Sequence, residues 1–275
     1  ANGFGSYIEN AWVNFRLSDK LSVTAGKQDA AWGGFEYDEY AYKIYDYSDM
    51  NEWMDCYFTG IGISYEPVET QELCLQVTNG NDNRRKSPSF YNIGWNSSYL
   101  DELLSLRYSV TAGQQAKGEW MWMMWAGQQV ESGKFLGYFD VMYTRGKSDP
   151  VGILAEQFEP EDEENGAWIA NTGNLSLVAR LNYSIHPKWN IFVKGMYETA
   201  SVYKDNGPYE SGKYRTAWGY QGGVEFYPMG DDNLHLFLTG TGRAYSLTER
   251  AKALDAFSEN TGRLSVGFVY KIPLF

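Results

Sequence analysis

The chain of 275 residues has little of what marks most other classes of protein. Its longest nearly unbroken apolar stretch is WMWMMWAG (Trp120 to Gly127), far short of the roughly 20 residues that a membrane-spanning helix needs. It has two histidines, and its two cysteines, Cys56 and Cys74, match no spacing typical of a metal or redox site. Basic residues are too few to balance the acidic ones, and the net charge is −12. Because a general nucleic-acid binder needs a basic surface, nucleic acid is not expected as a partner.

What the chain has instead is aromatic residues and a repeated alternation of side chains. Aromatics make up 17% of the residues, with 22 tyrosines and 10 tryptophans. In the last segment, RLSVGFVYKIPLF (263–275), every second residue from Leu264 to Leu274 is apolar. This alternation predicts a β-strand with one apolar and one polar face. About 13 such segments follow one another: 11–17, 21–26, 61–65, 71–79, 90–99, 103–113, 120–130, 135–146, 175–185, 189–197, 217–227, 234–247 and 263–275.

The connections between these segments alternate between short and long. Short ones are expected near 18–20, 66–70, 100–103, 131–134, 186–188 and 228–232, and the long series at 34–56, 82–89, 115–118, 148–172, 204–214 and 247–260. All short turns then lie at one end of the strands. This is typical of an up-and-down membrane barrel with short periplasmic turns and long outer loops. A soluble sandwich has Greek-key crossings and no reason to keep such an order.

The two faces of the segments favour a membrane. The polar faces carry Gly, Ser, Thr, Asn and Gln with single scattered charges, as a water-filled lumen does, and Trp and Tyr lie near strand ends. An open sheet edge in hydrocarbon would leave backbone groups without hydrogen bonds, so closure is expected. We therefore predict an all-β fold, a transmembrane up-and-down antiparallel β-barrel forming one domain over 1–275, in the bacterial outer membrane of a Gram-negative cell.

The strand number carries a further expectation. About 13 strands put the two ends of the chain on opposite sides of the membrane, whereas single-chain bacterial barrels normally have an even number. We expect that N-terminal strands precede Ala1 and that the complete barrel has 14 to 16 strands. The first residues, ANGFGSY, show no basic-then-apolar leader.

Two motifs resemble those of bacterial outer-membrane barrels. The C-terminal strand ends in Phe275, which resembles the signature that marks such barrels for insertion, although Phe275 is out of phase with the apolar positions. The stretch VTAGKQDAAWGGFEYDEY (23–40) has a strand ending in Gly26-Lys27 and then Gly34-Phe35-Glu36. It resembles the phosphate-selective porin O/P family, in particular its variants in Bacteroidota.

That resemblance implies a porin in which this segment leaves a strand and folds toward the pore. The chain departs from the more usual Pro-Phe-Gly of the family by having Trp32-Gly33-Gly34, so phosphate specificity is not implied. The loop 34–56, rich in Tyr and Trp, is the expected constriction or partner contact. Its constriction candidates are Phe35, Glu36, Tyr37, Asp38 and Tyr45. Family porins are often trimers, which makes a homotrimer an expectation by resemblance.

Charged residues on the polar faces are the candidates for lining the lumen. They are the basic Arg16, Arg107, Arg180, Lys194, Arg243, Arg263 and Lys271, and the acidic Asp140, Glu198 and Glu225. The wall therefore leans basic, which would favour anions. In the alternative interpretation, these charges keep the lumen wet and pair across strands.

Most of the negative charge lies in expected loops. The acidic stretches 36–55 and 158–166 could bind calcium or bridge divalent cations at the lipopolysaccharide surface, or simply be solvated. The basic NRRKS (83–87) could contact lipid phosphates or face water.

Catalysis is not expected. His186 and His235 both fall at the end of the short turns, so no Ser/His/Asp set can assemble at the outer rim, and no metal or cofactor is expected. The sequence favours a diffusion porin for small hydrophilic solutes, leaning toward anions. The alternative is a scaffold barrel within a larger outer-membrane complex, with little or no conductance. The expected partners are the lipid bilayer, lipopolysaccharide, solutes and other outer-membrane proteins.

Overall fold

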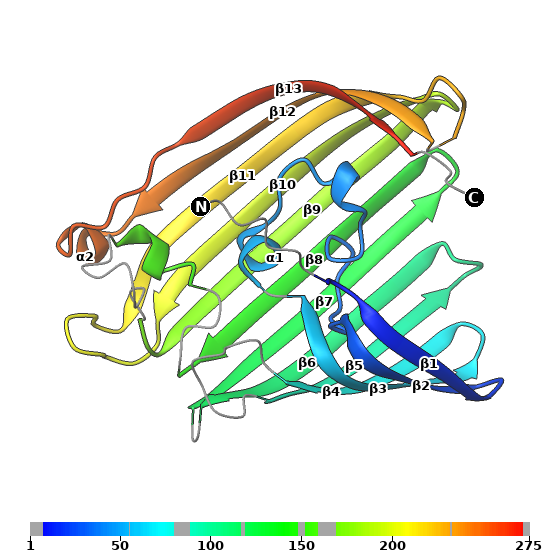
Figure 1. Cartoon of the computed structure of the whole chain (residues 1–275). Coiled ribbons are helices and arrows are strands. Elements are labelled where there is room, and N and C mark those ends of the chain that lie inside the picture. Colours follow the sequence, from blue (N-terminus) through cyan, green and yellow to red (C-terminus); the bar gives the residue numbers. More distant parts are fainter. Residues whose placement is uncertain are drawn as a thin grey trace, which may run out of the picture.

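The computed structural model describes residues 8–54, 56–79, 89–116, 119–147, 152–158, 169–231 and 233–271. Within them the chain forms one antiparallel sheet of 13 strands, in which each strand pairs with the next in sequence (Figure 1). The strands are β1 (Ala11–Ser18), β2 (Leu21–Asp29), β3 (Tyr57–Val68), β4 (Gln71–Asn79), β5 (Ser89–Tyr99), β6 (Leu104–Ala116), β7 (Glu119–Ser132), β8 (Phe135–Gly146), β9 (Thr172–His186), β10 (Trp189–Val202), β11 (Gly212–Phe226), β12 (Leu234–Leu247) and β13 (Thr261–Tyr270). The strand number expected from the alternation is confirmed.

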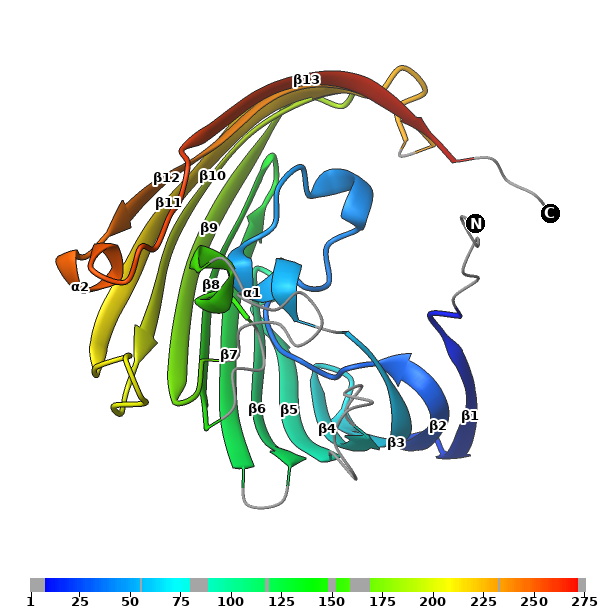
Figure 2. The same cartoon turned by 60° about the vertical axis from the view of Figure 1, so that its left-hand side comes forward.

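The sheet curves into an incomplete cylinder (Figure 2). Over the described residues β1 and β13 pair only with β2 and β12, so both remain edges and the expected closure is not observed. The two edge strands β1 and β13 lie apart, on the two sides of the opening in the sheet (Figure 2). Phe275 and Pro273 of the terminal motif lie outside the described residues.

The short and long connections fall at opposite ends, as the sequence predicts. The turns β1–β2, β3–β4, β5–β6, β7–β8, β9–β10 and β11–β12 form one end, which we call the short-turn end. The tight β5–β6 turn places Leu100, Asp101 and Glu102 at positive φ. At the other end, short helices η2 (Ala155–Gln157) and α2 (Glu249–Lys252) lie in the long loops. The basic stretch 83–87 lies outside the described residues, and so does the acidic stretch 158–166 apart from Phe158. The hypotheses on these two stretches therefore stay predictions.

The convex face of the sheet is apolar. Ile63 on β3, Leu75 on β4 and Ile93 on β5 pair side by side, and each is exposed. On β13, Val266 is 82% exposed. Exposed aromatic residues border this surface near strand ends: Tyr65, Tyr99, Tyr183, Trp189 and Tyr270 at the short-turn end, and Tyr91, Trp120 and Trp122 at the other. A band of aliphatic side chains between two aromatic borders is what a bilayer-facing sheet presents.

The described helices are all too short or too polar to cross a membrane. Besides η2 and α2 they are η1 (Ala41–Lys43) and α1 (Asp49–Trp53), both in the connection between β2 and β3. We call this connection the inward loop (residues 30–56, of which 55 is not described), because it lies within the curvature of the sheet (Figure 2).

The concave face is less polar than the predicted water-filled lumen. Met121, Met123 and Trp125 of β7 point inward and are buried. With Trp32 and Met50 of the inward loop they belong to one apolar cluster that reaches toward the long-loop end. Because these inner positions pack against the loop rather than water, both faces of this part of β7 are apolar.

Candidate channel lining and the inward loop

The inward loop first runs across the inner wall as a strap. The Ala31 N–H donates to Oε1 of Gln76 on β4 at 2.9 Å, and the Gly33 N–H donates to Oγ of Ser109 on β6 at 2.8 Å. Trp32, between them, stacks on Trp125 with 5.3 Å between ring centroids. A Cβ on Gly33 would lie 2.6 Å from the Arg107 carbonyl oxygen, so only glycine allows this approach.

Asp140 on β8 holds the end of the strap. Its carboxylate accepts the Phe35 N–H at 3.0 and 2.9 Å and the Glu36 N–H at 2.7 Å. Asp140 is fully buried, and so is Glu36. Hydrogen bonds from backbone N–H groups to a carboxylate are among the stronger kinds. Phe35 and Glu36 are therefore fixed against the wall, whereas Asp38 next to them is exposed.

The side chain of Glu36 is the centre of a buried polar network. It forms an ion pair with Lys194 of β10, and both side chains are 0% exposed. It also accepts the Ser48 N–H at 3.1 Å and hydrogen bonds from the Ser48 hydroxyl and the Asn51 amide. Burial raises the pKa of the Glu36 carboxyl, but the Lys194 charge and these hydrogen bonds outweigh it and hold the pKa below its ordinary value. Lys194 also donates to the Asp46 carbonyl at 2.7 Å, which ties two parts of the loop to one strand.

A second cluster holds the start of α1. Arg243 of β12 pairs with Asp46 at 3.2 Å, with Asp49, and with Glu198 of β10 at 3.2 Å. Arg215 of β11 also pairs with Asp49. The Asp49 N–H in turn donates to Oε1 of Glu198 at 2.5 Å. The negative charges of the loop thus lie directly on the positive charges of the wall.

Arg180 of β9 and Glu225 of β11 contact the loop nearer the short-turn end. Arg180 donates to the Lys43 carbonyl oxygen at 2.8 Å, and the Tyr45 hydroxyl donates to Glu225 at 2.7 Å. Burial and the Glu225 carboxylate raise the pKa of the Tyr45 hydroxyl, which keeps its proton for this hydrogen bond. The Tyr45 ring stacks on Phe192. This half of the loop is therefore attached through both polar and aromatic contacts.

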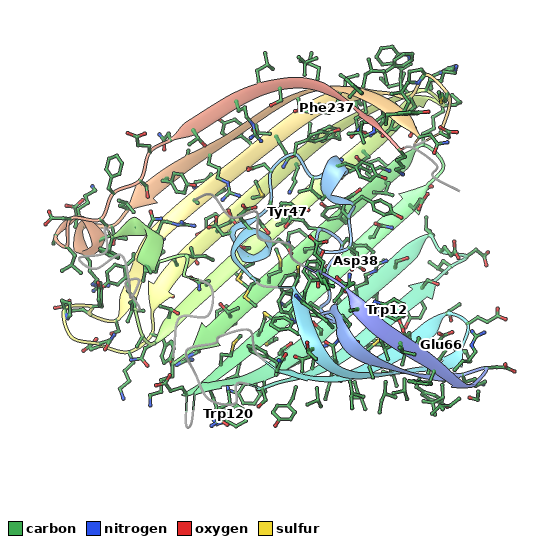
Figure 3. The ribbon with its side chains drawn as sticks, viewed as in Figure 1. Trp12, Asp38, Tyr47, Glu66, Trp120 and Phe237 are labelled. Carbon is green, nitrogen blue, oxygen red and sulfur yellow. The ribbon has the colours of Figure 1, made fainter. Side chains whose placement is uncertain are left out.

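The remaining candidates are Arg107 on β6 and three residues on or beside the edge strands β1 and β13. Arg107 of β6 pairs with Asp38, and Arg263 of β13 donates to the Tyr45 carbonyl oxygen at 2.7 Å. The ammonium of Lys271 lies 4.8 Å from the centroid of the Tyr42 ring. Arg16 on β1 lies apart from the loop, beside a hollow at the short-turn end. Figure 3 shows Asp38 and Tyr47 inside the curvature of the sheet, with Glu66 at the short-turn end of β3.

The structure thus brings nine of the ten wall candidates into contact with one loop; Arg16 is the exception. Of the loop candidates, Tyr37 is half-buried between Trp32 and Trp125. A role of these residues in a constriction stays a prediction. Sequence reasoning missed Arg215, Asp46 and Asp49. Extending the alternation around Trp218 three residues backwards would have placed Arg215 on the inner face.

The described part of the acidic stretch, 36–54, lies within the curvature of the sheet (Figure 2), whereas the calcium and lipopolysaccharide hypotheses place the stretch on the outer surface. Its carboxylates at positions 36, 46 and 49 pair with Lys194, Arg215 and Arg243. Among the described residues no group of three or more His, Cys, Asp or Glu side chains could hold a metal ion. His186 is the last residue of β9 and His235 the second residue of β12, so both lie at the short-turn end, where the sequence placed them. Cys56 and Cys74 form no disulfide.

Comparisons with known proteins agree with this arrangement. The family described as phosphate-selective porin O and P matches residues 1–92 and 84–272. OmpT of Vibrio cholerae is 11% identical with a TM-score of 0.59, covering 95% of this chain and 78% of its own. A trimer form of OmpT from the same organism, also 11% identical over 95% and 78%, has a TM-score of 0.58. The outer membrane channel DcaP of Acinetobacter baumannii is 9% identical with a TM-score of 0.62, covering 90% and 70%.

A comparison with curated proteins finds no significant match. At these identities the solved structures show the fold alone, while the family match extends over nearly the whole chain. The chain therefore belongs to the phosphate-selective porin O and P family, and it is an outer-membrane protein with the fold of a porin.

Proposed function

We propose that the protein is a channel for the passive diffusion of small hydrophilic solutes across the outer membrane. The observation that carries this proposal is the division of the sheet into two faces. The convex face is aliphatic between aromatic borders, and the concave face carries the charged residues and the inward loop. A loop clamped to the inner wall narrows a passage without moving, so transport needs no energy source and no cofactor. Membership of a porin family supports the same function.

We further propose that the charge preference of the channel is weak. The basic wall that predicts anion preference is offset by the loop, because Arg107, Lys194 and Arg243 each pair with a loop carboxylate. A close ion pair presents only the field of a dipole to a passing ion, which falls off faster than that of a single charge. A weak remaining preference for anions would come from Arg16 and from Arg263, because Arg263 donates to a carbonyl oxygen that carries no net charge.

A liposome-swelling assay tests the channel directly. Vesicles containing the purified full chain should swell in isotonic arabinose, and more slowly in larger neutral sugars, because passage through a fixed bore depends on solute size. Matched vesicles without protein are the control. Absence of swelling with every solute, despite folded and inserted protein, would contradict a diffusion channel.

A second function, a non-conducting scaffold, is favoured by one observation. The inward loop and the apolar cluster around Met50, Met121 and Met142 fill much of the concave face. A scaffold would insert without swelling or conductance. Assembly into a homotrimer, which a solved form of OmpT shows for that protein, is part of the proposal for either function.

A further inference from the structure

A hollow of about 300 Å³ lies between the inward loop and the short-turn ends of β8 to β11. This volume is at the lower end of the range for small-molecule sites. Its lining is mixed in charge: Arg180, Lys43 and Lys134 are basic, and Glu39, Glu131, Glu225 and Asp231 are acidic. Such a lining gives no strong reason to admit an ion of either sign.

Arg180 is a buried residue of this lining, and several contacts fix its orientation. Its side chain is 2% exposed, and its guanidinium carbon lies 4.5 Å from the centroid of the Phe192 ring. Nε donates to Oδ1 of Asn182 at 3.2 Å and Nη1 donates to the Lys43 carbonyl oxygen at 2.8 Å. A guanidinium carries five N–H groups in a fixed plane. These contacts therefore hold Arg180 in place and leave N–H groups for another partner.

Two carboxylates lie beside those groups at a distance too long for a hydrogen bond. Nη1 of Arg180 is 4.0 Å from Oε2 of Glu39, and Nη2 is 4.0 Å from Oε1 of Glu225. Hydrogen bonds of this kind are about 2.7–3.2 Å long. One oxygen atom placed about 2.8 Å from both members of a pair would close the gap, with an angle of about 90° between its two hydrogen bonds.

The chemistry of that bridging oxygen is restricted. It must accept from the guanidinium and donate to the carboxylate, and a water molecule or the hydroxyl group of a solute that replaces the water does both. A carboxylate only accepts, and both a carboxylate and a phosphate dianion would be repelled by Glu39 and Glu225, whereas an ammonium only donates and would be repelled by Arg180. Two such gaps on the two sides of one guanidinium match two hydroxyl groups of one molecule.

We propose that this hollow, which we call the Arg180 site, binds a neutral polyhydroxylated solute of the saccharide class. Two sugar hydroxyls bridge Arg180 to Glu39 and to Glu225, and the amides of Asn182 and Asn190 line the hollow for others. The proposal rests on the proposed channel function and adds the class of solute. It places a solute subsite on the short-turn side of the inward loop.

Saturation-transfer NMR and isothermal titration calorimetry on the full chain in detergent micelles test the site without requiring conductance. The probes are D-glucose and D-xylose, with inorganic phosphate and ammonium as charged counterparts. We expect saturable binding of the sugars and none of the ions. Glu39→Ala removes one of the two carboxylates that accept from the bridging hydroxyls. Because the Glu39 side chain is partly exposed, the variant should keep its fold. The sugar affinity should fall about tenfold, as expected for loss of one hydrogen bond to a charged group.

Glu66→Ala is the matched control, because Glu66 is a glutamate at the same end of the sheet but outside this hollow. It should leave the sugar affinity unchanged. Absence of saturable sugar binding, tighter binding of phosphate, or equal affinity of wild type and Glu39→Ala would each overturn the site. Swelling without sugar binding would support the diffusion channel and contradict the Arg180 site. Sugar binding without swelling would support the Arg180 site and contradict the diffusion channel.

Discussion

Replacing Glu36 with glutamine should detach the middle of the inward loop from the concave face of the sheet. The substitution keeps the shape of the side chain and removes its charge. The ammonium of Lys194, whose side chain is completely buried, then loses the carboxylate with which it is directly paired. The Ser48 N–H also loses its charged acceptor. Because an isolated charge in a dry site is strongly unfavourable, the loop is expected to open and admit water to Lys194.

The size of this effect follows from the burial of the pair. Removing one partner of a buried ion pair costs about 3–5 kcal/mol, because the other charge stays desolvated. This corresponds to a shift of about two to four orders of magnitude in the equilibrium between attached and detached loop. Removing both charges at once is far less costly. The double variant Glu36→Gln with Lys194→Met should therefore restore most of the attachment.

Limited trypsin digestion of the detergent-solubilised protein measures the attachment, because the loop carries Lys43. Mass spectrometry of the fragment ending at Lys43 should show slow cleavage in wild type, fast cleavage in Glu36→Gln and intermediate or slow cleavage in the double variant. Glu66→Gln, a charge-removing change away from the loop, serves as the control. Cleavage of Glu36→Gln at the wild-type rate, or of the double variant as fast as the single one, would show that the Glu36–Lys194 ion pair does not hold the loop.

Three further predictions concern the contacts of the inward loop and the convex face of the sheet. Since the pKa of Glu36 is lowered in the folded protein, the contacts of its carboxylate with Lys194 and the Ser48 N–H should be complete at neutral pH and be lost only as the pH falls below the ordinary glutamate range; hydrogen exchange of the Ser48 N–H measures this, and loss near neutral pH would contradict it. Leu75→Arg on the convex face should destabilise the protein by about 2–4 kcal/mol in urea unfolding from lipid vesicles if that position is deep in the bilayer; an unchanged midpoint would place Leu75 outside the hydrocarbon. Asp140→Ala leaves the N–H groups of Phe35 and Glu36 unpaired at about 1–3 kcal/mol each, measured as a lower midpoint of thermal unfolding, and an unchanged midpoint would count against the anchor.

The strands could be predicted from sequence because their pattern is local. The alternation of Leu264, Val266 and Phe268 with small residues defines one face without any knowledge of the neighbours, and β13 has these three side chains exposed. The order of short and long connections then determines which ends lie together. Both features depend only on residues close in sequence, and the structure has both of them.

The inner face could be predicted only in part, because its environment comes from a distant segment. Met121 and Trp125 are buried under a loop about 90 residues earlier in the chain, which no local pattern reveals. The acidic residues of that loop look like a solvated surface in the sequence. In the structure Asp49 instead supplies the counter-charge for Arg215 and Arg243.

The stretch 23–40, which resembles the porin family, contains the residues that attach the inward loop to the concave face. Gly33 and Gly34 precede the two residues that Asp140 holds. Gly33 allows the loop to touch the backbone of β6, and Gly34 has a φ of +92°, which glycine adopts at little cost. The spacing could be recognised from the sequence, but the contact with the wall could not.

The reversal potential of the wild-type protein in a planar bilayer under a gradient of potassium chloride shows both whether it conducts and whether its passage is charged. We expect stepwise ohmic currents with a reversal potential close to zero, because the loop carboxylates neutralise the basic wall of a water-filled passage. Insertion without current, or a reversal potential near the chloride equilibrium value, would contradict it.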